Sequence, residues 1–279
     1  MNEDSYSPYG DMGRGGNINM ELPGVRMEAV SWKRMLLLYE SALEVINAKI
    51  NVLNREFMLR FGYTPIEHIN SRIKSPQSIL RKLKINHREP LIGNVVRYIN
   101  DIAGIRIICS FTTDIYTIAE LIASQNDVKV LKIKDYIAHP KENGYMSYHM
   151  IVSVPVYLSQ QVVYTKVEIQ IRTIAMDFWA SLEHKMYYKF DGKAPEHIRR
   201  ELKECADITA FLDRKMLALN EEIQNYKMPE GSEDLVETTY EDTDYKENAY
   251  KEETIEEMFG IYVEQEVSIR EIDGEAEEQ

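Results

Sequence analysis

The sequence predicts an α/β (α+β) protein with one mixed β-sheet flanked by helices and a long helix at each end. Strict alternation of apolar and polar residues over Val163–Thr173 indicates a half-buried strand. Two more alternating segments, Asn100–Phe111 and Tyr145–Val154, supply further strands. Apolar residues at three- and four-residue steps near Arg26–Phe61 and Pro195–Lys227 indicate the two long helices.

The segment Val163–Thr173 carries a row of polar side chains on one face. Its apolar residues point to the other face, the expected core: Val163, Val167, Ile169 and Ile171. Glu168, Gln170 and Arg172 lie opposite them, with neighbours about 6.6–7 Å apart. A carboxylate, an amide and a guanidinium in a row can bind a metal and a polyanion. A solvent-facing strand is the alternative, and the next segment argues against it.

The second polar face lies within Lys134–Val154. Turn-forming residues over Pro140–Gly144 predict a loop, and a strand is expected to begin near Tyr145. Tyr145 and His149 would then share one face of that strand, with Lys134 and Lys141 beside the loop. Lysine binds phosphate and an aromatic ring stacks on a base, so this pattern suits a nucleotide.

A helix start is predicted at Ser75, where a serine N-cap precedes a proline at the first helical position. Ser78 and Lys82 are four residues apart and share one face of this helix. Arg72 and Lys74 come just before its N-terminus, where backbone N–H groups favour anions.

The strand within Asn100–Phe111 is preceded directly by an aspartate, Asp101. Along this strand Ile105, Ile107 and Cys109 share one face, and Arg106 points to the other. A carboxylate just before a strand can bind a metal ion, and a turn aspartate is the alternative reading.

The two long helices have continuous apolar stripes. The first stripe comprises Trp32, Leu36, Tyr39, Leu43, Ile46, Ile50, Leu53 and Phe57. The second comprises Ile198, Leu202, Cys205, Ile208, Leu212, Met216, Leu219 and Ile223. Packing onto the sheet is expected to explain most of these positions.

Charge divides the 279-residue chain unevenly. Residues 229–279 contain 19 acidic and three basic residues, whereas the remainder has 27 acidic and 30 basic ones. We expect an acidic, largely disordered tail at 229–279, a disordered N-terminus at 1–24, and one domain at 25–228. Two cysteines, a polar N-terminus and no apolar run of about 18 residues predict a cytoplasmic protein without a membrane span.

Five ordered motifs over residues 65–190 together resemble the synthetase domain of the RelA/SpoT family, most closely its small single-domain alarmone synthetases of the RelQ type. They read S-R-I-K-S-P-Q-S-I, D-I-A-G-I-R, K-D-Y-I-x-x-P-K-x-N-G-Y-x-S-Y-H, E-I-Q-I-R-T and F-W-A-S-L-E-H-K. The resemblance implies a nucleotidyltransferase-like sheet. It also implies transfer of pyrophosphate from ATP to the ribose 3′-hydroxyl of GDP or GTP, which makes (p)ppGpp and releases AMP.

The resemblance also assigns roles to residues. Asp101 would bind Mg²⁺, with Glu168 as a second ligand or as the base for the 3′-hydroxyl. ATP would be bound by Arg72, Lys74, Ser78, Lys82 and Arg106, with the two arginines sandwiching the adenine. The acceptor would be bound by Lys134, Lys141, Tyr145, His149, Gln170, Arg172 and Asp177, with Tyr145 stacking on the guanine. In small alarmone synthetases such long helices also build a homotetramer, so the resemblance implies a homo-oligomer.

Departures from the family pattern leave two alternatives. Met146 stands where the family usually has arginine, and Asp177 where it has asparagine, with an added charge that could weaken binding of an anionic acceptor. A toxic relative that uses the 3′ end of tRNA or adenine nucleotides is one alternative. The body has no long basic stripe of the kind that RNA binding requires, which disfavours it. An inactive nucleotide- or RNA-binding regulator is the second alternative, disfavoured because both Asp101 and Glu168 are present.

Two motifs are absent from the sequence. There is no G-x-x-x-x-G-K-[ST] motif, so phosphate binding by a P-loop is not expected. There is also no His-Asp dipeptide of the kind found in the hydrolase domain of long family members. We therefore expect synthesis of the product without its degradation.

Overall fold

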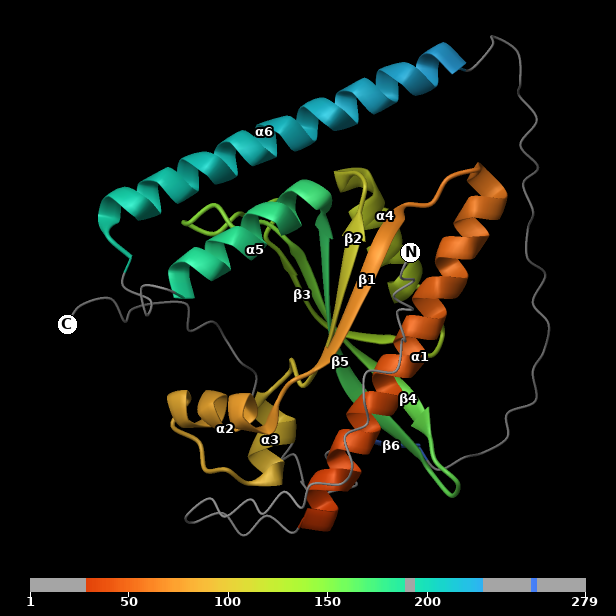
Figure 1. Ribbon diagram of the computed structural model, residues 1–279. Coiled ribbons are helices and arrows are strands. Elements are labelled where there is room, and N and C mark those ends of the chain that lie inside the picture. The colour runs from red at the N-terminus through yellow and green to blue at the C-terminus, as the bar shows by residue number, and fades with distance from the viewer. Residues whose placement is uncertain (1–28, 189–193, 228–251, 255–279) are drawn as a thin grey trace, which may run out of the picture.

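The computed structural model describes residues 29–188, 194–227 and 252–254 (Figure 1). A six-stranded mixed sheet has the order β1-β2-β5-β4-β3, with β6 paired to β5. The strands are β1 Ile66–Ile73, β2 Ala103–Cys109, β3 Lys129–Asp135, β4 Tyr148–Tyr157, β5 Val162–Thr173 and β6 Glu252–Thr254. The central pair, β2 and β5, is parallel, and β1, β4 and β3 run antiparallel to their neighbours. The predicted fold class is confirmed.

The described helices are α1 Ala29–Phe61, α2 Pro76–Ile85, α3 Ile92–Tyr98, α4 Thr112–Ala123, α5 Ile174–Tyr188 and α6 Glu196–Lys227. Two of them, α1 and α4, cover one face of the sheet. The long helix α1 crosses β1, β2, β5 and β4, and α4 packs beside it on β2 and β5. The core between these helices and the sheet contains Tyr39, Ile46 and Ile50 of α1, all fully buried. The predicted apolar stripe of the first long helix is therefore confirmed as a packing face.

The second long helix differs from the prediction. Along α6 the apolar stripe is exposed, by 60% at Ile208, 53% at Leu212 and 50% at Met216. The expectation that packing on the sheet explains this stripe is wrong, because α5 lies between α6 and the sheet edge (Figure 1). Inward contacts of α6 are made instead by small or polar residues such as Ala206 and Asp213, which are 2% and 8% exposed.

Two strand boundaries also differ from the prediction. The strand expected from Tyr145 begins at Tyr148, because Lys141 N–H donates to the Tyr145 carbonyl at 3.1 Å and closes a turn first. The strand β1 was not anticipated. A bulge between Ile66 and His68 breaks its two-residue alternation, which left no strand signal.

The termini predicted to be disordered, 1–24 and 229–279, lie outside the described residues except for β6. The strand β6 pairs in parallel with Val162–Tyr164 at the start of β5. None of the described helices combines the length and apolar character that spanning a bilayer needs.

Candidate active site

The strand register aligns polar residues from five strands in two adjacent rows on the sheet face opposite α1. One row runs through Asn70, Arg106, Gln170, His149 and Lys134. In the next row, Arg72 pairs with Gly104, Gly104 with Glu168, and Glu168 with Ile151. Because successive strand residues point to opposite faces, the buried isoleucines between these rows fix the polar side chains on the open face.

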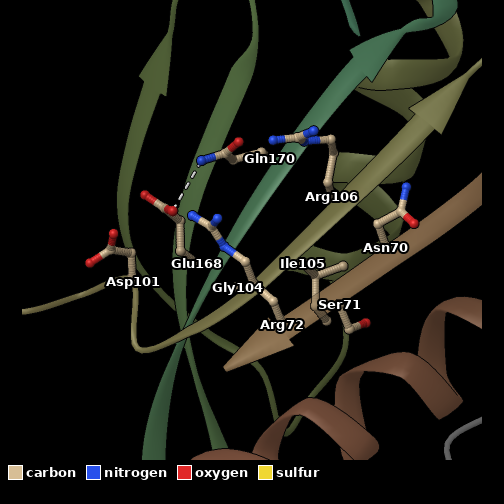
Figure 2. Close-up of a pocket in the computed structure, with 9 residues that line it drawn as sticks. All are labelled: Asn70, Ser71, Arg72, Asp101, Gly104, Ile105, Arg106, Glu168 and Gln170. Atoms are coloured by element: carbon tan, nitrogen blue, oxygen red, sulfur yellow. Dashed lines mark hydrogen bonds between the residues drawn. The ribbon is translucent and has the colours of Figure 1, made fainter. Parts of the chain in front are cut away.

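A first pocket lies over β1, β2 and β5. It is lined by Asn70, Ser71, Arg72, Asp101, Gly104, Ile105, Arg106, Glu168 and Gln170. Arg72 and Arg106 extend from neighbouring strands to the same side of the sheet as Glu168 (Figure 2). Their planar guanidinium groups provide two faces on which an aromatic base can stack.

Asp101 stands at one end of this pocket, in the turn before β2, and accepts hydrogen bonds from two lysines. Lys74 Nζ lies 2.7 Å from its Oδ2, and Lys82 Nζ lies 2.9 Å from its Oδ1. Lys82 comes from α2, which begins after the predicted N-cap Ser75, whose side chain accepts from Ser78 N–H. The helix start therefore brings a second cation to Asp101.

A second pocket lies over β3 and β4 on the other side of the two carboxylates. It is lined by Lys82, Tyr98, Asn100, Asp101, Lys132, Lys134, Tyr136, Lys141, His149, Ile151 and Glu168. Four lysines give it a cationic wall, and Lys141 Nζ lies 4.8 Å from the Tyr136 ring centroid and 5.0 Å from that of Tyr145. Cations next to aromatic rings suit a ligand with both phosphates and a base.

Arg172 is 4% exposed, lines neither pocket and is the centre of a hydrogen-bond network that reaches both of them. It donates to Tyr145 Oη at 2.6 Å, to Gln170 Oε1 at 3.2 Å and to Asp177 Oδ1 at 3.0 Å. Asp177 Oδ1 also lies 3.2 Å from Arg106 Nη1. The charge of Asp177 is thus balanced by two arginines, which removes the reason to expect that it repels an anionic acceptor.

Asp101 and Glu168 line both pockets, so any ligands in the two pockets would meet at these carboxylates. The structure brings most predicted residues to this junction, with two exchanges between sides. Gln170, predicted on the acceptor side, lines the first pocket, and Lys82, predicted for ATP, lines the second. Five predicted residues line neither pocket: Lys74, Ser78, Tyr145, Arg172 and Asp177. Ser78 hydrogen-bonds Ser75 instead.

Comparisons with known proteins match this chain over the same region. A sequence profile described as "Region found in RelA / SpoT proteins" matches residues 71–193. The GTP pyrophosphokinase YwaC of Bacillus subtilis is 48% identical over 192 residues, which are 69% of this chain and 91% of that relative. The chain belongs to the RelA/SpoT family.

Two solved structures of this family add ligands to the comparison. The small alarmone synthetase 1 of Bacillus subtilis bound to its product pppGpp is 35% identical, with a TM-score of 0.64. That match covers 69% of this chain and 98% of the other. The same enzyme bound to AMPCPP is 32% identical, with a TM-score of 0.60, over 70% of this chain and 99% of the other.

Sequence reasoning missed several residues that line the second pocket, among them Tyr98, Lys132 and Tyr136. Lys132 could have been found, because it lies two residues before Lys134 and so shares its side of a strand. Tyr136 stands within the family motif K-D-Y-I. Tyr98 carried no signal, because it reaches the pocket from α3, a short helix that no pattern placed there.

The two carboxylates of this RelA/SpoT-family site have opposite pKa shifts. Burial alone would raise the pKa of Asp101, but the hydrogen bonds from Lys74 and Lys82 outweigh it and lower this pKa. Burial and the nearby charge of Asp101 raise the pKa of Glu168, despite a hydrogen bond from Gln170. Asp101 therefore stays ionised, while Glu168 binds a proton more readily, as a general base requires.

These shifts predict the acid side of the pH–rate profile. Activity should fall as Glu168 takes a proton, at a pH above 4.5, its ordinary pKa. His149 should not contribute, because burial and the neighbouring Arg172 and Lys141 lower its pKa to about 4. The measurement is kcat/KM against pH for the wild type and His149→Asn, which should share one acid limb. A limb near the ordinary histidine pKa that disappears in His149→Asn would instead assign it to His149.

Proposed function

We propose that this protein transfers the pyrophosphoryl group of ATP to the ribose 3′-hydroxyl of GDP or GTP, which yields (p)ppGpp and AMP. The observation that carries the proposal is the pair of pockets that share Asp101 and Glu168. A transfer between two nucleotides needs two binding sites with the reacting groups at their junction. The relatives named GTP pyrophosphokinase and the neighbours bound to pppGpp or AMPCPP support this reaction.

The first pocket would bind ATP. Arg72 and Arg106 would stack on the two faces of the adenine, a use of the planar guanidinium that lysine cannot reproduce. At the junction with the second pocket, Lys74 and Lys82 would contact the phosphates after exchanging their present partner, Asp101, for the nucleotide. Ser78, at the N-terminus of α2, would add a hydrogen bond there.

The second pocket would bind the guanosine acceptor. Lys134 and Lys141 would contact its 5′ phosphates, and Tyr145 would stack on the guanine. His149 is neutral and hydrogen-bonds Tyr145 Oη across 2.8 Å, so it would orient this ring. Gln170, Arg172 and Asp177 would keep Tyr145 in position through the hydrogen-bond network centred on Arg172.

Magnesium is part of the proposal because two carboxylates face the junction. Mg²⁺ is usually bound by one or two carboxylates together with substrate phosphates, and Asp101 with Glu168 fits that donor set. When bound, it would neutralise the triphosphate and the charge that develops on the leaving AMP.

Glu168 would act as the base or as a second metal ligand. As the base it would take the proton of the 3′-hydroxyl while the 3′ oxygen bonds to the β-phosphorus of ATP. The bond from the β-phosphorus to the oxygen bridging the α- and β-phosphates breaks at the same time, and AMP leaves with that oxygen. Gln170 Nε2 donates to Glu168 at 3.0 Å and would hold it in place.

The exposed apolar face of α6 supports a proposed homo-oligomer, for which a tetramer is our expectation. Its exposed members include Phe211, Leu212, Met216 and Tyr226, the last 82% exposed. Light scattering should show an assembly for the wild type that Leu212→Glu reduces to smaller species. A monomeric wild type would contradict this part of the proposal.

The reaction is tested by product analysis with a panel of acceptors. Protein, ATP and Mg²⁺ would be incubated with GDP, GTP, GMP, bulk tRNA or no acceptor, and the products separated by anion exchange and identified by mass spectrometry. We expect AMP with ppGpp or pppGpp, stable over time because no hydrolysis is expected. AMP with modified tRNA or adenosine polyphosphates, and no guanosine product, would overturn the proposal.

A further inference from the structure

The loop that carries Tyr145 packs directly against α6, a helix that lines neither pocket. We call residues 136–147 the acceptor loop. Gly144, in this loop, is buried and has a φ of 86°, a conformation that favours glycine. A Cβ atom at Gly144 would collide with the Cβ of Ala206, which is 2% exposed. The loop and α6 therefore touch with no room for an added methyl group.

Two hydrogen bonds fix the position of α6 on either side of this contact. Trp179 Nε1 donates to the Leu202 carbonyl at 2.9 Å, one turn before Ala206. Thr173 Oγ1 donates to Asp213 Oδ2 at 2.7 Å, two turns after it, and both of these residues are buried. Thr173 directly follows Arg172, so α6 is attached to the end of β5 that carries the arginine bonded to Tyr145.

Tyr145 links this contact to the site. One side of the residue packs against the small apolar cluster of Trp179, Ala180 and Ala206. Its hydroxyl accepts from Arg172 and hydrogen-bonds His149. Asn143 Nδ2 donates to Glu183 of α5 at 3.2 Å, which also ties the loop to the same pair of helices.

Met146, two residues after Gly144, adds an apolar side chain to the contact between the loop and α6. It lines a small cavity together with Met176, Trp179, Ala206 and Thr209. This flexible apolar side chain fills space between the loop and α6.

We propose that α6 positions the acceptor loop through the packing of Ala206 on Gly144, so that Ala206 is a positioning residue for the guanosine acceptor. The proposal rests on the assignment of the second pocket to that acceptor. All residues that line the first pocket lie on β1, β2, β5 or the turn before β2, so ATP binding does not depend on α6 in the same way. Displacing α6 from the loop should weaken binding of the acceptor and leave binding of ATP unchanged.

The test compares Ala206→Val with Cys205→Val, which places the same valine one residue earlier at an exposed position of α6. Valine at 206 adds two methyl groups to the Cβ that already lies against Gly144, so we expect it to push the loop away from α6. We expect the KM for GDP to rise about tenfold in Ala206→Val, with the KM for ATP within about twofold of the wild type. Cys205→Val should change neither constant. An unchanged KM for GDP in a folded Ala206→Val protein would overturn the proposal.

A fluorescence measurement keeps the test decisive if Ala206→Val does not fold. The chain has two tryptophans, Trp32 and Trp179, so Trp32→Phe leaves Trp179 as the single reporter at the contact. GDP should change its emission, whereas a non-hydrolysable ATP analogue should not. Calorimetry would measure GDP binding in parallel. Binding of GDP without an emission change would overturn the positioning role alone, and failure of the wild type to bind guanine nucleotides would overturn the proposed function with it.

Discussion

Replacing Glu168 with glutamine should reduce kcat by about 10²–10⁴-fold while the protein stays folded and still binds ATP. Glutamine has the same shape and can still accept the hydrogen bond from Gln170 Nε2. It can neither take a proton nor supply an anionic ligand, so either role of Glu168 is lost. The measurement is the rate of AMP formation at saturating ATP and GDP.

The same substitution should not lower stability. The pKa of Glu168 is raised in the folded protein, so at pH 7 its ionised form is less favourable there than in the unfolded chain. A neutral glutamine removes this cost, and the melting temperature should stay level or rise. Glu120→Gln, an exposed glutamate on α4, is the matched control and should keep full activity. Turnover retained in Glu168→Gln would contradict the assigned role.

Replacing Asp101 with asparagine should reduce the rate about 10³-fold and lower stability as well. The rate should fall because the proposed carboxylate ligand of Mg²⁺ is lost, an effect of several kcal/mol. Stability falls because Lys74 and Lys82 lose an ionised partner at 2.7 and 2.9 Å. We expect a loss of about 1–3 kcal/mol in the free energy of unfolding at pH 7. The pKa of Asp101 is lowered in the folded protein, so this difference should disappear as pH falls through that pKa.

A readout other than turnover separates the role of Asp101 in metal binding from its structural role. In wild type, Mg²⁺ should tighten binding of a non-hydrolysable ATP analogue measured by calorimetry, and Asp101→Asn should abolish this tightening. Asp127→Asn is the control, because Asp127 also accepts from a lysine, Lys49, at 2.7 Å but lies outside both pockets. Tightening by Mg²⁺ that survives in Asp101→Asn would place the metal elsewhere.

The opposite pKa shifts of these two carboxylates follow from different surroundings. Asp101 has two charged lysines within hydrogen-bond distance. Glu168 accepts a hydrogen bond from the uncharged side-chain amide of Gln170 and faces the charge of Asp101. Neither surrounding was visible in the sequence. Lys74 and Lys82 are 27 and 19 residues from Asp101. The pairing of β1 with β2 brings Lys74 close, and the position of α2 brings Lys82 close.

Local patterns predicted the parts of the site that one element positions. The row Glu168, Gln170 and Arg172 followed from strand alternation, and the start of α2 followed from Ser75 and Pro76. The positions of the elements relative to one another could not be predicted from local patterns. The place of Gln170 depends on the register of β2, β5 and β4, and that of Lys82 on the position of α2, and no single segment specifies either.

The error on α6 has a physical explanation. Its three- and four-residue apolar spacing correctly predicted a helix, but spacing alone does not say what covers an apolar face. The face that contacts the body is built around Ala206, where small size allows Gly144 to approach. An alanine gives no hydrophobic signal in the sequence, so the larger residues of the opposite face dominated the prediction.

We propose that a nucleotide donor and a guanosine acceptor meet at Asp101 and Glu168. The test of this meeting compares AMP release from ATP with GDP against AMP release from ATP with 3′-deoxy-GDP. We predict AMP and ppGpp in equal amounts with GDP, and no AMP above background with the 3′-deoxy analogue. Equal AMP release with both nucleotides would contradict the account, because the acceptor hydroxyl at the junction would then not be the group that reacts.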